Sequence, residues 1–214
     1  MRDLEFVVQD KQTESYLLGP GAIKLGLGAL DRLELRKIPR PHIEELSAKT
    51  RETVFLAIAQ EDQAVYIDKV IGSQELRMDV PVGAHRPYNC TAVGKILLQN
   101  FSDDEIEKLA LKGAFEAKTE NSLTEVAALM AEIGKIRKQG WASDKGEFQQ
   151  GSGCVAAPLY DHEGNLIAAL TVSGPAARIN EHFGELLVDA RASAQAVSEA
   201  MGYLERVSNK VGSL

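Results

Sequence analysis

The chain has 214 residues, of which 44% are hydrophobic and 26% are charged, and its formal net charge is −7. This profile is typical of a globular protein long enough for one or two domains with a real core. A net negative charge argues against a protein that binds a nucleic-acid backbone by itself, because phosphates bind to clustered Lys and Arg. No apolar run approaches the length of a membrane span or a secretion signal, and the two cysteines fit a reducing compartment. We therefore expect a cytoplasmic protein without a membrane partner.

The first 36 residues predict a hairpin followed by a helix. Leu4–Gln9 and Ser15–Leu18 are short apolar strands separated by a polar turn. An isolated two-stranded hairpin is marginally stable in water, so this one needs a packing partner. The apolar residues of Ala22–Leu35 recur at helical spacing over a wide surface, which predicts a helix that contacts another chain or domain.

From residue 37 onward, groups of strands and helices follow one another. Pro39-Arg40-Pro41 breaks the chain before a short helix, His42–Thr50. Because short polar turns join several of the later strands, we expect antiparallel pairing and an α+β fold, with helices packed on one antiparallel sheet. Strands are predicted at Thr53–Gln60, Ala64–Ile71, Leu76–Val82, Trp141–Asp144, Cys154–Tyr160 and Leu166–Ser173, and further helices at Cys90–Asn100, from Ser102 to about Gly113, from Asn121 or Ser122 to Lys138, and from Asn180 to about Val207.

Three small polar side chains are expected to meet in this sheet. Residues i and i+2 of a strand point to the same face, so Thr171 and Ser173 share one face of the last strand. If Cys154 lies on a neighbouring strand, the three form a polar cluster in an apolar sheet. Such a cluster indicates a pocket for a small polar molecule.

Catalysis and metal binding are alternative interpretations of these residue types. A nucleophilic Cys154 needs a base, and His85 could approach it in space, but no spacing indicates that it does. A cysteine next to Val-Ala-Ala is more often a buried apolar residue. The four histidines are scattered and no Cys-x-x-Cys occurs, so no metal site is predicted. The glycines at 19–21 and 151–153 do not make a dinucleotide fingerprint.

The segment Gly83–Lys95 leads from a predicted strand into a helix start through small residues. Free N–H groups at a helix N-terminus bind carboxylates, and Thr91, Ala92 and Gly94 would let a ligand approach the backbone. A tight contact between helix and sheet would require the same small residues, so both interpretations stay open.

Asp144, Met78 and Leu76 also admit two interpretations each. Asp144 follows an apolar strand end, where it would accept a hydrogen bond from a ligand hydroxyl or lie solvated in a turn. Met78 and Leu76 would line an apolar pocket wall or fill the core.

Together these segments resemble the IclR family of bacterial transcriptional regulators. The resemblance runs over nearly the whole chain, in the right order and spacing. It is carried by Tyr16-Leu-Leu-Gly-Pro-Gly21, Val82-Gly-Ala-His-Arg-Pro87, Thr91-Ala-Val-Gly-Lys95, Asp144-Lys-Gly-Glu147, Gly151, Cys154-Val-Ala-Ala-Pro158 and Thr171-Val-Ser-Gly-Pro175.

The resemblance implies a division of the chain into three parts. Residues 1–19 would be the remnant wing hairpin of a winged helix-turn-helix, residues 20–36 a linker helix, and residues 37–214 a GAF-like effector-binding domain. The helices that contact operator DNA would precede the wing, so we expect DNA binding only through a part that this sequence lacks. The family also implies a homodimer or homotetramer.

The resemblance further implies a non-enzymatic pocket for a small organic acid, with no cofactor. Backbone N–H groups of Ala92 and Val93 would hold the effector carboxylate, and Thr171 stands where Ser is frequent, which keeps the hydroxyl and adds a methyl. A cysteine-dependent enzyme on a sensor-like fold is the alternative. The expected ligand-binding residues are Leu76, Met78, Ala92, Val93, Asp144, Cys154, Thr171 and Ser173.

Overall fold

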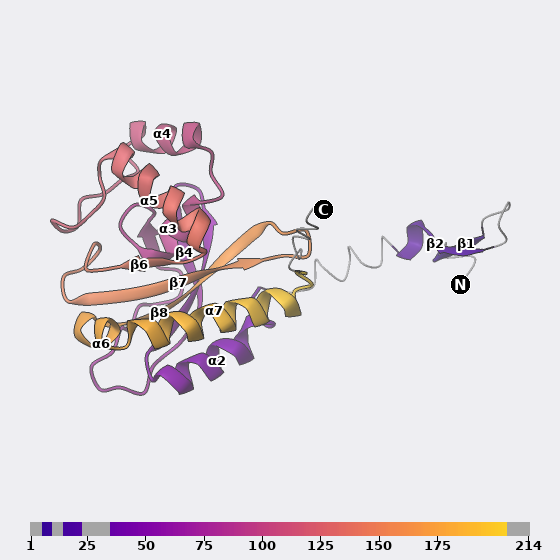
Figure 1. Ribbon diagram of the computed structural model, residues 1–214, viewed down its shortest axis with the longest axis horizontal. Helices are drawn as coiled ribbons and strands as arrows, with labels where there is room; N and C mark the ends of the chain where they lie inside the picture. The colour runs from indigo at the N-terminus through magenta and orange to yellow at the C-terminus, as the bar shows by residue number, and fades with distance from the viewer. Residues whose placement is uncertain (1–5, 10–14, 23–34, 205–214) are drawn as a thin grey trace, which may run out of the picture. The chain divides into compact units, whose positions relative to one another are not determined.

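The computed structural model describes residues 6–9, 15–22 and 35–204 (Figure 1). The chain divides into two compact units, residues 1–38 and residues 39–214. In the first unit, β1 (Val7–Gln9) pairs antiparallel with β2 (Tyr16–Leu18), so the described part of the predicted hairpin is present. Residues 20–22 are helical, whereas the hairpin turn at 10–14 and most of the predicted linker helix lie outside the described residues.

The second unit is built on a six-stranded antiparallel sheet with the strand order β5-β4-β3-β8-β7-β6. Helices α2 and α7 lie on one side of this sheet and α3, α4 and α5 on the other (Figure 1). The α+β prediction is therefore confirmed. The strands are β3 (Thr53–Gln60), β4 (Gln63–Val70), β5 (His85–Pro87), β6 (Ala142–Asp144), β7 (Ser152–Tyr160) and β8 (Leu166–Pro175), and the helices are α2 (Pro39–Thr50), α3 (Ala92–Leu98), α4 (Asp103–Leu111), α5 (Val126–Gln139), α6 (Ala176–Glu181) and α7 (Phe183–Ala200).

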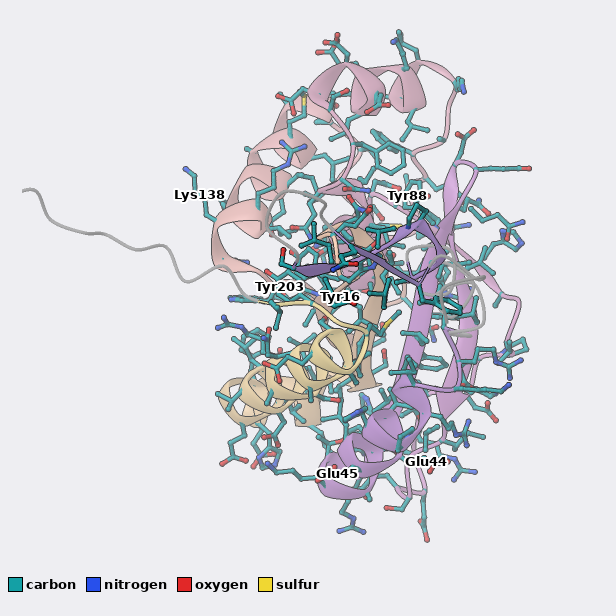
Figure 2. The ribbon with its side chains drawn as sticks, turned by 90° about the vertical axis from the view of Figure 1, so that its right-hand side faces the viewer. Tyr16, Glu44, Glu45, Tyr88, Lys138 and Tyr203 are labelled. Carbon is teal, nitrogen blue, oxygen red and sulfur yellow. The ribbon has the colours of Figure 1, made fainter. Side chains whose placement is uncertain are left out.

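Burial follows the helix and strand periodicities. On α2, Ile43 and Leu46 are buried, whereas Glu44 and Glu45 point outward (Figure 2). The core between the sheet and α3–α5 contains fully buried aliphatic and aromatic side chains, each of which stabilises the fold by roughly 1.5–3 kcal/mol. They include Phe55, Tyr88, Ile96, Leu97, Leu129, Ile133 and Ile136.

The predicted strand Leu76–Val82 is wrong. These residues form part of an irregular strap, residues 72–84, and the strand that pairs with β4 on the side away from β3 is the later segment β5. Carbonyls at the start of the predicted strand accept from side chains and not from a neighbouring strand: the Thr53 hydroxyl donates to the Met78 carbonyl at 2.6 Å, and the Arg178 guanidinium donates to the Leu76 carbonyl at 2.7 Å.

Two helix starts also differ from the prediction. Helix α2 begins at Pro39 and not after the proline pair, because first-turn residues need no N–H donor. Helix α5 begins at Val126, since the Ser122 hydroxyl accepts from the Lys118 and Thr119 N–H groups and donates to the Glu147 carbonyl.

The helix predicted from Asn180 to about Val207 corresponds to α7, and a separate short helix, α6, precedes it. Helix α6 ends at Glu181, and α7 begins at Phe183. His182 between them has φ −106°, outside the helical range. Helix α7 ends at Ala200, and Gly202 just beyond it has a positive φ of 92°.

Candidate functional site

The predicted polar cluster forms where β7 and β8 pair. Cys154 lies directly opposite Ser173, with 2.9 Å between its Sγ and the Ser173 Oγ. Thr171 lies two residues earlier on β8, and its hydroxyl donates to the Val155 carbonyl at 3.0 Å. The side chains of Ser173 and Thr171 are buried. The prediction that these three polar side chains meet on neighbouring strands is therefore confirmed.

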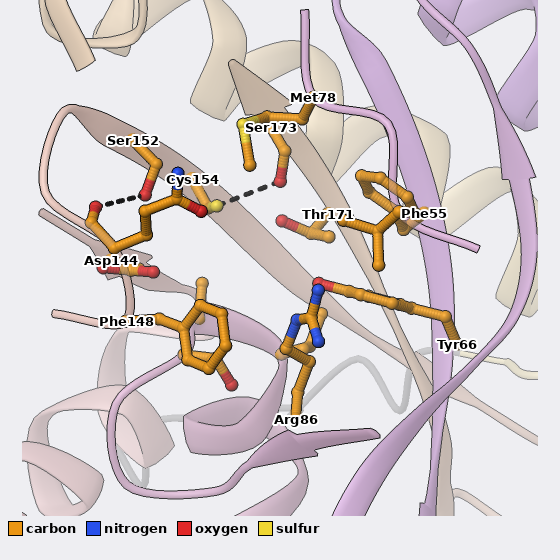
Figure 3. A pocket seen from close by; sticks show the side chains of 15 residues that line it. Phe55, Tyr66, Met78, Arg86, Asp144, Phe148, Ser152, Cys154, Thr171 and Ser173 are labelled. Carbon is orange, nitrogen blue, oxygen red and sulfur yellow. Dashed lines mark hydrogen bonds between the residues drawn. The ribbon is translucent and has the colours of Figure 1, made fainter. Parts of the chain in front are cut away.

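A cavity of about 30 Å³ opens beside this cluster (Figure 3). Seven of the eight residues expected at a ligand site line it: Met78, Ala92, Val93, Asp144, Cys154, Thr171 and Ser173. Leu76 does not, because its side chain lies on the surface with 70% of its area exposed. The remaining lining residues are Phe55, Tyr66, Val80, Arg86, Thr91, Phe148, Gln149 and Ser152.

The start of α3 presents backbone donors to this cavity. Thr91 is the N-cap: its hydroxyl accepts from the Gly94 N–H at 3.0 Å, and its carbonyl accepts from the Lys95 N–H at 3.0 Å. The N–H groups of Ala92 and Val93 have no acceptor in the described part of the chain, although both residues are buried. Buried donors without an acceptor are rare in folded proteins, so these two are suited to an anionic ligand.

The close-packing interpretation of the same segment holds at Gly94. A Cβ at this position would lie 2.5 Å from both the Cα and the carbonyl oxygen of Tyr88. No side chain fits at that distance, so glycine is required where α3 meets the segment that precedes it. Both interpretations of this segment therefore hold, for different residues: Gly94 allows close packing, and Ala92 and Val93 line the cavity.

Asp144 is buried at the end of β6, with only 3% of its area exposed. The solvated-turn interpretation is therefore wrong. Its Oδ1 accepts from the Glu147 N–H at 2.7 Å. Burial raises the pKa of Asp144 to about 6, against the opposing effect of the Glu147 N–H and the nearby Lys95 charge.

A buried ion pair beside the cavity was not predicted from the sequence. Lys95 Nζ lies 2.6 Å and 2.8 Å from the two carboxylate oxygens of Glu147. Burial raises the pKa of Glu147, and the Lys95 charge opposes this shift. The available signal was a lysine within the apolar helix Ala-Val-Gly-Lys-Ile-Leu-Leu, because a buried cation requires a partner.

Arg86 is a second residue that the sequence interpretation missed. It lies in the His85-Arg86-Pro87 strand, and its guanidinium carbon lies 4.7 Å from the centre of the Phe148 ring and 5.4 Å from that of Tyr66. Figure 3 shows the guanidinium between these two rings, pointing into the cavity. Arg86 is the only positively charged residue among the described residues that line the cavity.

The chemistry of Cys154 differs from that of a nucleophile. Burial, followed by the Asp144 charge, raises the pKa of its thiol to about 12, whereas an activated thiol has a lowered pKa. His85, the base considered above, is exposed on β5 and makes no hydrogen bond to Cys154 in the described structure. Both cysteines are free thiols.

The described residues contain no group of three or more His, Cys, Asp or Glu side chains that would hold a metal ion. None of their helices is both long and apolar enough to cross a bilayer.

The sequence is similar to known regulators of transcription. Over 204 residues it is 33% identical to the HTH-type transcriptional regulator KdgR of Escherichia coli (strain K12), with 95% of this chain and 78% of that protein covered. Over 202 residues it is 29% identical to the HTH-type transcriptional repressor AllR of the same strain, with 92% and 73% covered.

Solved structures and a family model agree with these similarities. The crystal structure of the Thermotoga maritima IclR matches with a TM-score of 0.74 at 32% identity, covering 94% of this chain and 82% of that one. The C-terminal domain of E. coli KdgR matches with a TM-score of 0.71 at 31% identity, covering 80% and 100%. Residues 27–199 match the family described as bacterial transcriptional regulator IclR, C-terminal. The chain belongs to the IclR family of bacterial transcriptional regulators and carries its C-terminal, effector-binding part.

Proposed function

We propose that the cavity beside β7 and β8 binds a small organic acid and that this binding modulates DNA binding. The observation that carries the proposal is the pair of Ala92 and Val93 N–H groups, which have no acceptor among the described residues and belong to buried residues that line the same cavity as the Cys154–Ser173 cluster. Two adjacent amides at a helix start bind the two oxygens of a carboxylate.

The other lining groups would recognise the rest of the effector. The Thr171 hydroxyl donates its hydrogen to Val155, so it offers a ligand only its lone pairs. One of the two S–H and O–H hydrogens of Cys154 and Ser173 forms the hydrogen bond between them. The other hydrogen is free to donate to a ligand. The Asp144 carboxylate would accept from a hydroxyl, and Met78 would cover an apolar part. These roles favour a short acid with hydroxyl or keto groups.

The size of the cavity implies that binding moves side chains. A cavity of about 30 Å³ is far smaller than the roughly 300–1,000 Å³ of typical ligand pockets, so an organic acid needs more room than it offers. Met78 is long and flexible, so it is the side chain that would give way. Met78 belongs to the strap, whose position would then differ between the free and the bound protein. Such a difference allows a ligand to shift a conformational equilibrium.

The partners follow from the family. DNA binding would be carried by a helix-turn-helix part, as the names of KdgR and AllR state for those proteins. We further propose that the protein acts as a homodimer or homotetramer in the cytoplasm, with operator DNA and the effector as its ligands and no membrane partner.

Calorimetric titration with a panel of small carboxylates tests the pocket. We expect at least one acid to bind, and Ser173→Ala to weaken that binding by about tenfold, because a buried hydrogen bond contributes about 1.4 kcal/mol. Ser193→Ala is the control, since Ser193 lies on α7 outside this cavity. If no acid binds, or if both variants bind like the wild type, the proposed pocket is wrong.

A further inference from the structure

Arg86 is a cation without an acidic partner in the described structure. Its Nη1 donates to the carbonyl of its neighbour His85 at 2.8 Å. Arg40, Arg137 and Arg178, in contrast, each form an ion pair with a carboxylate. The aromatic faces of Tyr66 and Phe148 flank the Arg86 guanidinium in the cavity wall, and no described carboxylate forms an ion pair with it.

Arg86 and the free amides of α3 belong to one tightly folded segment. The Thr91 hydroxyl donates to the Pro87 carbonyl at 2.8 Å, which folds the chain back on itself between Arg86 and α3. Gly94 is packed against the backbone of Tyr88 so closely that a Cβ would collide with it. The backbone that carries Arg86 is therefore fixed relative to the start of α3, and Arg86, Ala92 and Val93 line one cavity.

Charge in the cavity depends on Arg86. The only charged side chains among the described lining residues are Arg86 and Asp144, since Lys95 and Glu147 pair with each other beside the cavity. Without Arg86, an effector carboxylate would meet two neutral amides and the negative Asp144. With Arg86, the same carboxylate meets a planar guanidinium that matches its geometry.

We propose that Arg86 is the counterion of the effector: its guanidinium and the Ala92 and Val93 amides bind the same carboxylate. Arg86 thereby makes the pocket selective for acids over neutral molecules of the same shape. This inference rests on the proposed organic-acid function and assigns the residue that sets charge selectivity at that site. The remaining polar groups, at Asp144 and β8, then recognise the uncharged part of the effector.

The test compares an acid with its own primary amide, which has nearly the same shape but no charge. Both are titrated calorimetrically into the wild type, Arg86→Met, Arg86→Lys and Arg77→Met, with the acid of the panel that binds best. Arg77 is exposed on the strap and does not line the cavity, so its variant removes the same charge from outside the site.

We expect Arg86→Met to weaken binding of the acid by at least about tenfold while binding of the amide changes by less than about threefold, because a charged hydrogen-bond pair is lost. Arg86→Lys should keep part of the preference for the acid, and Arg77→Met should keep all of it. Urea unfolding of each variant confirms that the fold is intact.

Three outcomes would contradict the inference. If Arg86→Met keeps the wild-type ratio of acid to amide affinity, or weakens binding of both ligands equally, Arg86 does not select charge. The proposed pocket still stands in that case if Ser173→Ala weakens binding of the acid. If Arg77→Met lowers the ratio as much, the effect is one of overall charge. If the wild type binds no acid at all, the proposed function fails together with this inference.

Discussion

Asp144 shows how a single residue at this site opposes the stability of the fold. Its carboxyl is nearly fully buried, and burial raises its pKa from 3.8 to about 6. A raised pKa means that the folded protein binds the proton more tightly than the unfolded chain does. The ionised form present at neutral pH therefore destabilises the fold, which is typical of a group retained for binding.

Replacing Asp144 by asparagine should stabilise the protein in a pH-dependent way. Below about pH 4, Asp144 is protonated in the folded and unfolded states and contributes no difference. Between about pH 4 and 6 the folded protein holds a proton that the unfolded chain has released, so wild-type stability falls as pH rises. Above pH 6 the full destabilisation of about 3 kcal/mol is present, at about 1.4 kcal/mol for each pKa unit.

Urea unfolding of Asp144→Asn and wild type at pH 4 and pH 7.5 measures this effect. We expect the stability difference to move by about 1–3 kcal/mol in favour of the variant between the two values. Asp79→Asn is the control: Lys69 lowers the pKa of the exposed Asp79, so that variant should gain nothing at neutral pH. A pH-independent difference for Asp144→Asn would show that Asp144 does not titrate as inferred.

The residues of the site differ in how far the sequence predicted them. Thr171, Ser173 and Cys154 followed from strand alternation, because period two holds wherever a strand forms. The pairing of Lys95 with Glu147, 52 residues away, depends on how α3 packs against the β6–β7 loop. Arg86 was visible in a motif, but its stacking on Tyr66 and Phe148 required the fold.

Among the elements, α3 depends most on one backbone contact. Gly94 lies in its first turn, where the nearest atoms to an added Cβ belong to the backbone of Tyr88 and Pro87, at 2.5–2.6 Å. Backbone atoms cannot move aside as a flexible side chain does. Any larger residue must therefore push α3 away from the segment that carries Arg86.

Gly94→Ala should accordingly destabilise the protein by several kcal/mol, because overpacking costs about 1–3 kcal/mol even where side chains can adjust. Gly134→Ala is the matched control: Gly134 lies within α5 and an added Cβ meets nothing within 4 Å. Alanine in a helix interior stabilises by about 0.5–1 kcal/mol over glycine, so this variant should gain stability. Urea unfolding should show a lower free energy of unfolding for Gly94→Ala and a higher one for Gly134→Ala. A Gly94→Ala variant as stable as the wild type would contradict the packing argument.

The element that the sequence failed to predict has a conformation determined by hydrogen bonds to residues far away in the chain. The strap at 72–84 has the alternation of a strand, and Met78 and Val80 do face inward. Its carbonyls, however, bind Thr53 and Arg178, which lie 25 and 102 residues from their acceptors. The long strands β3, β7 and β8 were predicted because their own residues determine them.

At the scale of the whole molecule, the site is assembled within one unit. Strand order places β8 in the middle of the sheet, between β3 and β7, so residues from both halves of the chain meet at the cavity. Every described residue that lines it lies between Phe55 and Ser173. The first unit, residues 1–38, contributes none of them.

A chain that begins at Ile38 should therefore fold and bind the effector like the full chain. Trp141 is the only tryptophan, and it packs edge-on against Phe183 with 5.5 Å between the ring centres, so its fluorescence reports on the second unit in both proteins. We expect the urea midpoints seen by Trp141 to agree and effector affinities to differ by less than about twofold, because no lining contact has been removed. A shorter chain that unfolds without cooperativity, or that folds but loses the effector, would show that residues 1–37 complete the site. Equal affinity in the two chains would instead place the whole of ligand recognition in the second unit, and leave to the first unit only the response to it.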